Sequence, residues 1–256
     1  MSISNDKKLK NLLEQWNSGF AATSAWMKTL GVSTQLTQKY LKSGWIEPLG
    51  RGAYKKNQDT VEWYGALASI QQQLSLPVHL GGPTALAAHG SVHYVRFGKE
   101  RVFLFSPLHQ KLPKWFQTYD WGNPIEHVTT SFLPENLGIT DLNYNGISVR
   151  TSSRGRAILE SLYLSPKQFD LLECYQMLEG MNNIRPDIVQ ELLVKCKSVR
   201  VKRLFLYMAK KAQLPILKFL NLSKIDLGVG DRSIVKNGIY NAEYKISIPK
   251  ELIDYV

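Results

Sequence analysis

Residues 33–54 read STQLTQKYLKSGWIEPLGRGAY, and this stretch decides the fold of the N-terminal region. Ser33 can cap a helix that runs to about Ser43, where Gly44 ends it. Residues 45–54 then place two short apolar segments around the turn Gly50-Arg51-Gly52, which predicts a β-hairpin. Apolar spacing predicts two earlier helices, over residues 7–16 and 23–30. Helix, helix, short turn, helix and hairpin is the order of a winged helix-turn-helix.

The third helix of this motif has two chemically different sides. Leu36, Tyr40 and Leu41 share an apolar side. The opposite side carries short polar and basic side chains, namely Thr34, Gln35, Gln38, Lys39 and Lys42. Glutamine can pair with adenine, threonine can contact a thymine methyl, and lysine can reach guanine or phosphate. The polar side therefore predicts a recognition helix that enters the major groove of DNA.

The hairpin adds two more candidate DNA contacts, Arg51 and Lys55. Two glycines flank Arg51, so its backbone can approach a duplex closely and its guanidinium can reach a phosphate or the minor groove. The whole chain has a formal net charge of +11, and a basic surplus of this kind favours an anionic partner. The alternative is a small helical module that uses the same packing for protein contacts.

The composition predicts a folded α+β protein in two parts. Hydrophobic residues make up 44% of the chain and charged residues 21%, a balance typical of globular proteins. We expect the winged helix-turn-helix to occupy residues 1–78, including a helix over about 60–74. Residues 79–256 would then form a mixed α/β C-terminal domain in which strands precede a helical block. The expected strands of this domain lie near 78–80, 101–105, 126–130, 147–151 and 240–248. The expected helices of the block span 154–164, 169–179, 186–195 and 198–212.

A second basic segment runs from Val194 to Lys218 and contains no acidic residue. Large apolar residues such as Leu204 and Phe205 give it one apolar side. One interpretation is a solvated helix face with no binding role. The other is a binding surface for an acidic protein or for nucleic acid. Its candidate residues are Lys195, Lys197, Arg200, Lys202, Arg203, Lys210 and Lys211.

The sequence lacks the motifs of common enzymes. It has no Walker A motif, no HExxH and no GxSxG. His89 and His93 are four residues apart, but Gly90 separates them, so we expect structural histidines rather than metal ligands. We therefore expect no catalytic residue, no metal and no cofactor.

Two further features suggest where the protein works. Cys174 and Cys196 lie in apolar stretches and are expected to be free, which fits a reducing cytoplasm. Residues 1–10 are polar, and no apolar run approaches the ~18 residues needed to span a bilayer. We therefore expect a cytoplasmic protein that does not enter the membrane.

The order of several motifs resembles the AbiEi family of antitoxins from type IV toxin–antitoxin systems. After the winged helix come Gly81-Gly82-Pro83-Thr84-Ala85-Leu86, the apolar strand 102–105, and the run Arg154-Gly155-Arg156-Ala157-Ile158-Leu159-Glu160. The chain closes with residues 231–236 and 244–249. The resemblance covers nearly the whole chain, and it depends on this joint order rather than on any one motif.

The resemblance implies a transcriptional autorepressor that binds inverted repeats upstream of its own operon. It also implies an antitoxin that counteracts a cognate nucleotidyltransferase toxin of the AbiEii type, with or without contact. Two alternatives remain open. One is a stand-alone winged-helix regulator with a ligand-sensing C-terminal domain, which a roomy apolar pocket would favour. The other is an enzyme such as a nuclease, which would need clustered carboxylates or histidines in a cleft.

Overall fold

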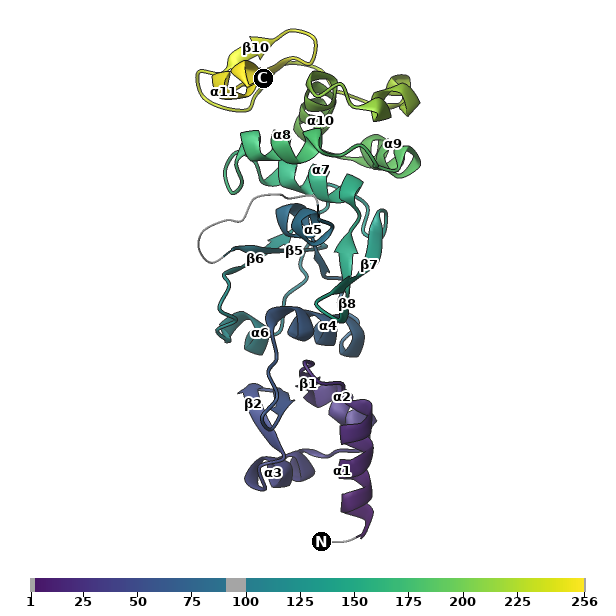
Figure 1. Ribbon diagram of the computed structural model, residues 1–256, viewed down its shortest axis with the longest axis vertical. Helices are drawn as coiled ribbons and strands as arrows, with labels where there is room; N and C mark the ends of the chain where they lie inside the picture. Colours follow the sequence, from purple (N-terminus) through teal and green to yellow (C-terminus); the bar gives the residue numbers. More distant parts are fainter. Residues whose placement is uncertain (1–2, 91–99, 256) are drawn as a thin grey trace.

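The computed structural model describes residues 3–90 and 100–255. Its N-terminal part is the predicted winged helix-turn-helix, and it occupies one end of an elongated molecule (Figure 1). The helices there are α1 Ile3–Gln15, α2 Ser24–Thr29 and α3 Thr34–Lys42. The strands are β1 Ala22–Thr23, β2 Ile46–Gly50 and β3 Ala53–Lys56, in the antiparallel order β1-β3-β2. We call the hairpin of β2 and β3 the wing.

Side-chain caps and a small core hold these helices in place. The Ser33 hydroxyl accepts a hydrogen bond from the Leu36 amide at 3.3 Å, which confirms the predicted start of α3. Leu36 and Tyr40 are buried on the inner side of α3. They pack in a cluster with residues of α1, α2 and β2, so the apolar side of α3 faces the core as predicted.

A five-stranded mixed sheet follows, in the order β6-β5-β4-β8-β7. Its strands are β4 His79–Leu80, β5 Val102–Ser106, β6 Ile125–Thr129, β7 Ile139–Tyr144 and β8 Ile147–Ser152. Helix α4 (Trp63–Gln73) contacts β8 on the side nearer the winged domain. Helices α5 (Gly82–Ala88) and α7 (Arg154–Leu164) pack together on the other side (Figure 1).

The helical block forms the rest of the molecule, with the three helices α8 Leu171–Glu179, α9 Pro186–Lys195 and α10 Val199–Lys211 after α7. Two 3₁₀ helices, Pro215–Phe219 and Leu222–Lys224, come next. The predicted strand over 240–248 is instead a hairpin. It joins β10 Ile239–Asn241 to β11 Ile246–Ile248, β11 also pairs with β9 Arg232–Ser233, and α11 Lys250–Asp254 ends the fold.

The elements that were not predicted include α6 (Lys114–Thr118) and β7. Strand β7 pairs with β8 through a turn at Asn145-Gly146, whose φ angles are 49° and 85°. An Asn-Gly pair between alternating segments is a strong hairpin signal, so the sequence did contain the information for β7.

The wing and the sheet region share one hydrophobic core. Leu49 and Ala53 of the wing belong to the same buried cluster as Trp115 and Phe116 of α6. A Cβ built on Gly50 would lie 2.8 Å from the Cβ of Trp115, so the end of the wing touches α6 directly. The predicted division at residue 78 stays a prediction, and α4 contacts both β1 and β8 across that region.

Candidate nucleic-acid interface and partner surface

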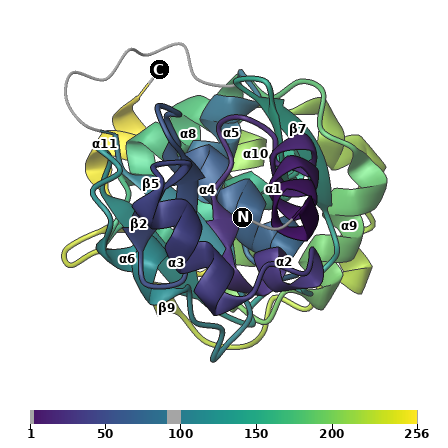
Figure 2. The same cartoon turned by 90° about the horizontal axis from the view of Figure 1, so that it is seen from below.

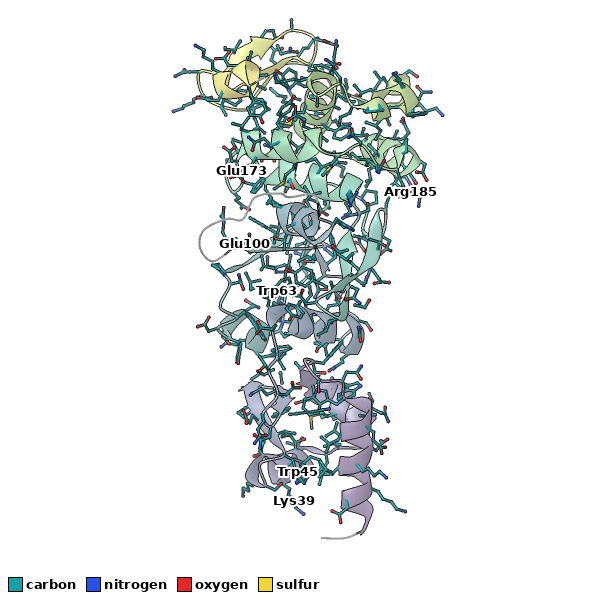
Figure 3. All side chains as sticks on the ribbon, in the orientation of Figure 1. Lys39, Trp45, Trp63, Glu100, Glu173 and Arg185 are labelled. Atoms are coloured by element: carbon teal, nitrogen blue, oxygen red, sulfur yellow. The ribbon has the colours of Figure 1, made fainter. Side chains whose placement is uncertain are left out.

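The polar side of α3 faces solvent over its whole length. The exposed residues are those named from the sequence, Thr34, Gln35, Gln38, Lys39 and Lys42. Figure 3 shows Lys39 near the end of the molecule at which the chain begins. Neither Lys39 nor Lys42 forms an ion pair with any residue that the structure describes. Their charges are therefore available to an anionic partner.

Arg51 is exposed on a turn that is anchored on two sides. The Ser24 amide donates a hydrogen bond to the Gly52 carbonyl at 2.8 Å, and Gly50 packs against Trp115. Gly52 has a φ of 90°, which favours glycine at that position. The backbone at Arg51 is thus held by α2 and α6, while its side chain reaches into solvent.

Lys55 already has protein partners. Its Nζ lies 2.8 Å from Oε2 of Glu47 and donates a hydrogen bond to the Asp59 carbonyl at 3.0 Å. The hydrogen bond from Lys55 lowers the pKa of Glu47. A phosphate would have to compete with these contacts, so Lys55 is a weaker candidate than Arg51.

The basic segment on α10 is built differently. Arg203 is only 2% exposed, and its guanidinium donates to four backbone carbonyls. These belong to Leu227 (2.8 Å), Gly228 (3.1 Å), Gly230 (2.7 Å) and Lys245 (3.0 Å). Arg203 therefore fastens α10 to the C-terminal segment.

Three more cations of this segment lie within the fold. Arg200 donates to the carbonyls of Tyr163, at 2.7 Å, and Ser165. Lys211 donates to the carbonyl of Tyr255 at 2.8 Å, and Lys202 is only 4% exposed. Arg200 is thus half-buried, and Lys202 and Arg203 are almost fully buried, so these three contribute little to the exposed surface; their role in partner binding stays a prediction.

Lys195, Lys197 and Lys210 are the exposed members of the set. Lys195 pairs with Glu191, and Lys210 lies 2.7 Å from Glu243. Among the residues that the structure describes, Lys197 has no ion pair. Of the seven candidate residues of this segment, Lys195, Lys197 and Lys210 are therefore the ones that the structure exposes.

A buried polar network that the sequence did not reveal lies where α5 and α7 pack against the sheet. The carboxylate of Glu160 is fully buried and accepts four hydrogen bonds. The donors are Nε2 of His79 (2.9 Å), Nε of Arg156 (2.8 Å), the hydroxyl of Ser152 (2.7 Å) and the amide of Gly82 (2.9 Å). This network joins β4, α5, β8 and α7.

The ionisation of this network follows from its surroundings. Burial alone would raise the pKa of Glu160. The opposing effect of His79, Arg156 and Ser152 is larger, and it lowers the pKa to about 2. Burial lowers the pKa of His79, so its imidazole is neutral at pH 7 and donates a hydrogen to Glu160. Arg156 is then the counter-charge. A buried carboxylate with four hydrogen-bond donors is typical of a structural ion pair.

The remaining predicted features concern metals, cysteines and membranes. His89 is hydrogen-bonded to the Ser152 carbonyl at 2.8 Å, whereas His93 lies outside the described residues. Within residues 3–90 and 100–255, no group of three or more His, Cys, Asp or Glu could hold a metal ion. Cys174 and Cys196 are free and buried, as predicted. No helix in the described part of the chain is long and apolar enough to cross a membrane.

Comparison with known proteins connects this architecture to a family. Residues 99–249 match the family described as "Transcriptional regulator, AbiEi antitoxin, Type IV TA system". Residues 5–97 match "Transcriptional regulator, AbiEi antitoxin N-terminal domain". The fold is similar to the crystal structure of the RV2827C protein from Mycobacterium tuberculosis, with a TM-score of 0.63 and 13% identity over 99% of this chain and 94% of that one. No curated protein sequence matches the chain.

Proposed function

Because the chain belongs to the AbiEi antitoxin family of type IV toxin–antitoxin transcriptional regulators, we propose that it represses its own operon by binding inverted repeats upstream of it. The observation that carries this proposal is the exposed polar side of α3, backed by the buried apolar side that fixes its orientation. A helix presented in this way can enter the major groove, which is wide enough to admit it.

The residues of α3 divide into two kinds of contact. Gln35 and Gln38 have the amide groups that pair with adenine, and Thr34 can contact a thymine methyl. Lys39 and Lys42 supply unpaired charge for guanine or phosphate. Arg51 would add a contact from the wing to the DNA backbone. Lys55 would add such a contact only if its ion pair with Glu47 broke. Specificity would therefore come from α3, and affinity from the lysines and the wing.

The second part of the proposal is antitoxin action. We propose that the protein counteracts a cognate nucleotidyltransferase toxin in the cytoplasm, and that it does so without catalysis, metal or cofactor. Lys195, Lys197 and Lys210 are the exposed basic residues of the helical block that could meet an acidic partner. Neutralisation without contact is equally compatible with the proposal.

A gel-shift titration tests the DNA-binding part directly. The purified chain is titrated against the DNA upstream of its gene and against a scrambled duplex, at two salt concentrations. We expect tight, salt-sensitive binding that prefers the upstream DNA. Equal weak binding to both duplexes would contradict sequence-specific repression. Expression beside the neighbouring gene then tests neutralisation by restoring or failing to restore growth.

One observation favours the alternative of a ligand-sensing regulator. A cleft of about 610 Å³ opens between β7, the start of α7 and α9. It is lined by Arg154 and Arg185 together with apolar residues such as Ile184, and its size falls within the range of ligand sites. A change in operator affinity on adding a metabolite fraction, together with failure to neutralise the neighbouring gene product, would favour this alternative.

A further inference from the structure

The cleft between β7, the start of α7 and α9 has a lining that favours an anionic ligand. Its volume is about 610 Å³, which lies within the range of sites for small organic molecules. Helix α9 and strand β7 lie on the same side of the molecule in both views (Figures 1 and 2). Arg154 and Arg185 bring permanent positive charge to the cleft, and no aspartate or glutamate is among the described residues that line it.

The first turn of α7 opens onto this cleft. Ser153 precedes the helix, Arg154 and Gly155 begin it, and all three line the cleft. The first amides of a helix have no acceptor within the helix, and the helix dipole adds partial positive charge at this end. An anion at this end of the cleft would therefore meet backbone donors in a positive field.

The Ser153 hydroxyl is also available to a ligand in the cleft. A serine just before a helix normally accepts a hydrogen bond from an amide of the first turn, but the side chain of Ser153 makes no such bond. Among the residues that the structure describes, its oxygen is the one buried side-chain N or O atom without a hydrogen-bond partner. Gly138 keeps the space beside this oxygen clear, because a Cβ there would lie 3.1 Å from it. Buried hydroxyls are normally satisfied, so this one points to a ligand.

The two arginines keep donors that a ligand can use. Nη2 of Arg154 donates to the His89 carbonyl at 2.7 Å, which uses one of five guanidinium N–H donors. Nη2 of Arg185 lies 2.5 Å from Oδ2 of Asp187, but the two side chains are 76% and 61% exposed. An exposed pair of this kind is weak, so an anion in the cleft can compete with Asp187. Figure 3 shows Arg185 at the surface, on the side of the molecule where α9 lies.

We propose that this cleft binds a small organic phosphate, with the phosphate group at the first turn of α7. Arg154 and Arg185 neutralise the phosphate, and the Ser153 hydroxyl and the amides of the turn donate hydrogen bonds to it. The organic part of the ligand packs against apolar side chains of the lining such as Ile139 and Ile184. The inference names the ligand class of the cleft that supports the ligand-sensing alternative, and it does not require α3 to read DNA.

Isothermal titration calorimetry on the full chain tests the proposal. The probes are adenosine monophosphate, uridine monophosphate and glycerol phosphate, each compared with its parent compound without phosphate. We expect at least one phosphate ester to bind with a Kd below about 1 mM, and its parent to bind at least about tenfold more weakly. If none of the esters binds in that range, or if the parent binds equally well, the proposal is overturned.

Two variants and a matched control locate the bound phosphate. Arg185→Ala should weaken binding about tenfold and Ser153→Ala about fivefold. Ser153→Ala should melt like wild type, because its hydroxyl has no partner within the described protein. Lys218→Ala also removes one exposed positive charge, but it lies outside the lining, so it should bind like wild type. Equal losses for Arg185→Ala and Lys218→Ala would reduce the effect to overall charge and overturn the site, as would wild-type affinity in Arg185→Ala and Ser153→Ala.

A gel shift without ligand separates this site from contacts to DNA. We expect Arg185→Ala to bind the upstream duplex like wild type. A loss of duplex affinity would make Arg185 a DNA contact and would contradict its role in the cleft. If the wild-type chain binds a phosphate ester but no DNA, the ligand site stands and the proposed repressor function fails.

Discussion

Helices α3 and α10 are both rich in basic residues, yet they use them in opposite ways. On α3 the cations point into solvent without ion-pair partners among the described residues. On α10, Arg200 and Arg203 donate to backbone carbonyls of the protein itself. The difference shows that a basic segment indicates a binding surface only where nothing else in the chain folds over it.

The cause of the difference lies far away in the sequence. Helix α3 lies at one end of the molecule (Figure 1), and its polar side is exposed among the residues that the structure describes. Residues 226–255 fold against α10, and the carbonyls of Leu227, Gly228, Gly230 and Lys245 in this segment accept hydrogen bonds from Arg203. A guanidinium has five donors in a rigid fork and can satisfy several such carbonyls at once.

Removing the guanidinium of Arg203 should have the largest effect on this contrast. Arg203→Ala removes the side-chain donor to four carbonyls near α10, one of which, that of Lys245, also accepts a hydrogen bond from the Arg232 amide at 2.9 Å. We expect the free energy of unfolding to fall by about 4 kcal/mol. Urea denaturation measures this loss, and Arg203→Lys should recover little of it because an ammonium cannot reproduce the fork. A variant as stable as wild type would show that the hydrogen bonds of Arg203 do not stabilise the fold.

The next largest effect is expected at Glu160, the buried carboxylate that pairs with Arg156. Its folded pKa of about 2 lies below the unfolded value of about 4.5, so the stabilisation is complete above pH 4.5. It is lost as the pH falls towards 2, and it amounts to about 3 kcal/mol. Glu160→Gln should be destabilised at pH 7 and should lack this pH dependence in denaturation experiments between pH 5 and 2. Glu243→Gln, at an exposed glutamate, should keep it.

On the α3 side, the expected effect is on binding rather than on folding. Lys39→Ala removes an exposed charge, and we expect operator affinity to fall by a factor of about ten, or about 1.4 kcal/mol. The melting temperature should stay within about 1 °C of wild type, because surface substitutions change stability little. A loss of stability without a loss of DNA binding would show that Lys39 supports the fold and does not contact DNA.

The smallest effect is expected at Lys210, the exposed end of α10. Its ion pair with Glu243 is solvated on both sides, and such pairs contribute about 0.5 kcal/mol or less. Lys210→Ala should therefore melt like wild type. If it also neutralises the toxin as well as wild type, Lys210 has no role in partner binding. Impaired neutralisation by the folded variant would show that the exposed end of α10 meets a partner.

Much of the fold follows from local signals in the sequence. The cap at Ser33 and the apolar spacing of Leu36 and Tyr40 were enough to predict α3 and its exposed side. Helices α7 and α9 have the predicted bounds. Helix α6 escaped prediction because it is one turn long, begins after a proline and is held mainly by Trp115 and Phe116 packing against distant elements.

The site could be predicted only in part, for a related reason. Residues that depend on a single helix, such as Lys39, were placed correctly on a solvent-facing side. Arg203 and Glu160 depend on partners that are distant along the chain. Arg203 meets the Lys245 carbonyl, and Glu160 of α7 meets His79 of β4. No helical or strand period carries information about such pairs, so the sequence alone could not show that these charges are internal.

The core shared by the wing and α6 has a consequence for how such proteins can be recombined. A chimera could take residues 5–97 from one relative and residues 99–249 from another. The residues at positions 49 and 53 would then pack against a residue at position 115 that comes from a different protein. Gly50 and Trp115 are in tight contact, because a Cβ built on Gly50 would lie 2.8 Å from the Cβ of Trp115. Exchange of DNA specificity between relatives is therefore easier by grafting the outer residues of α3 alone, since those side chains are exposed to solvent.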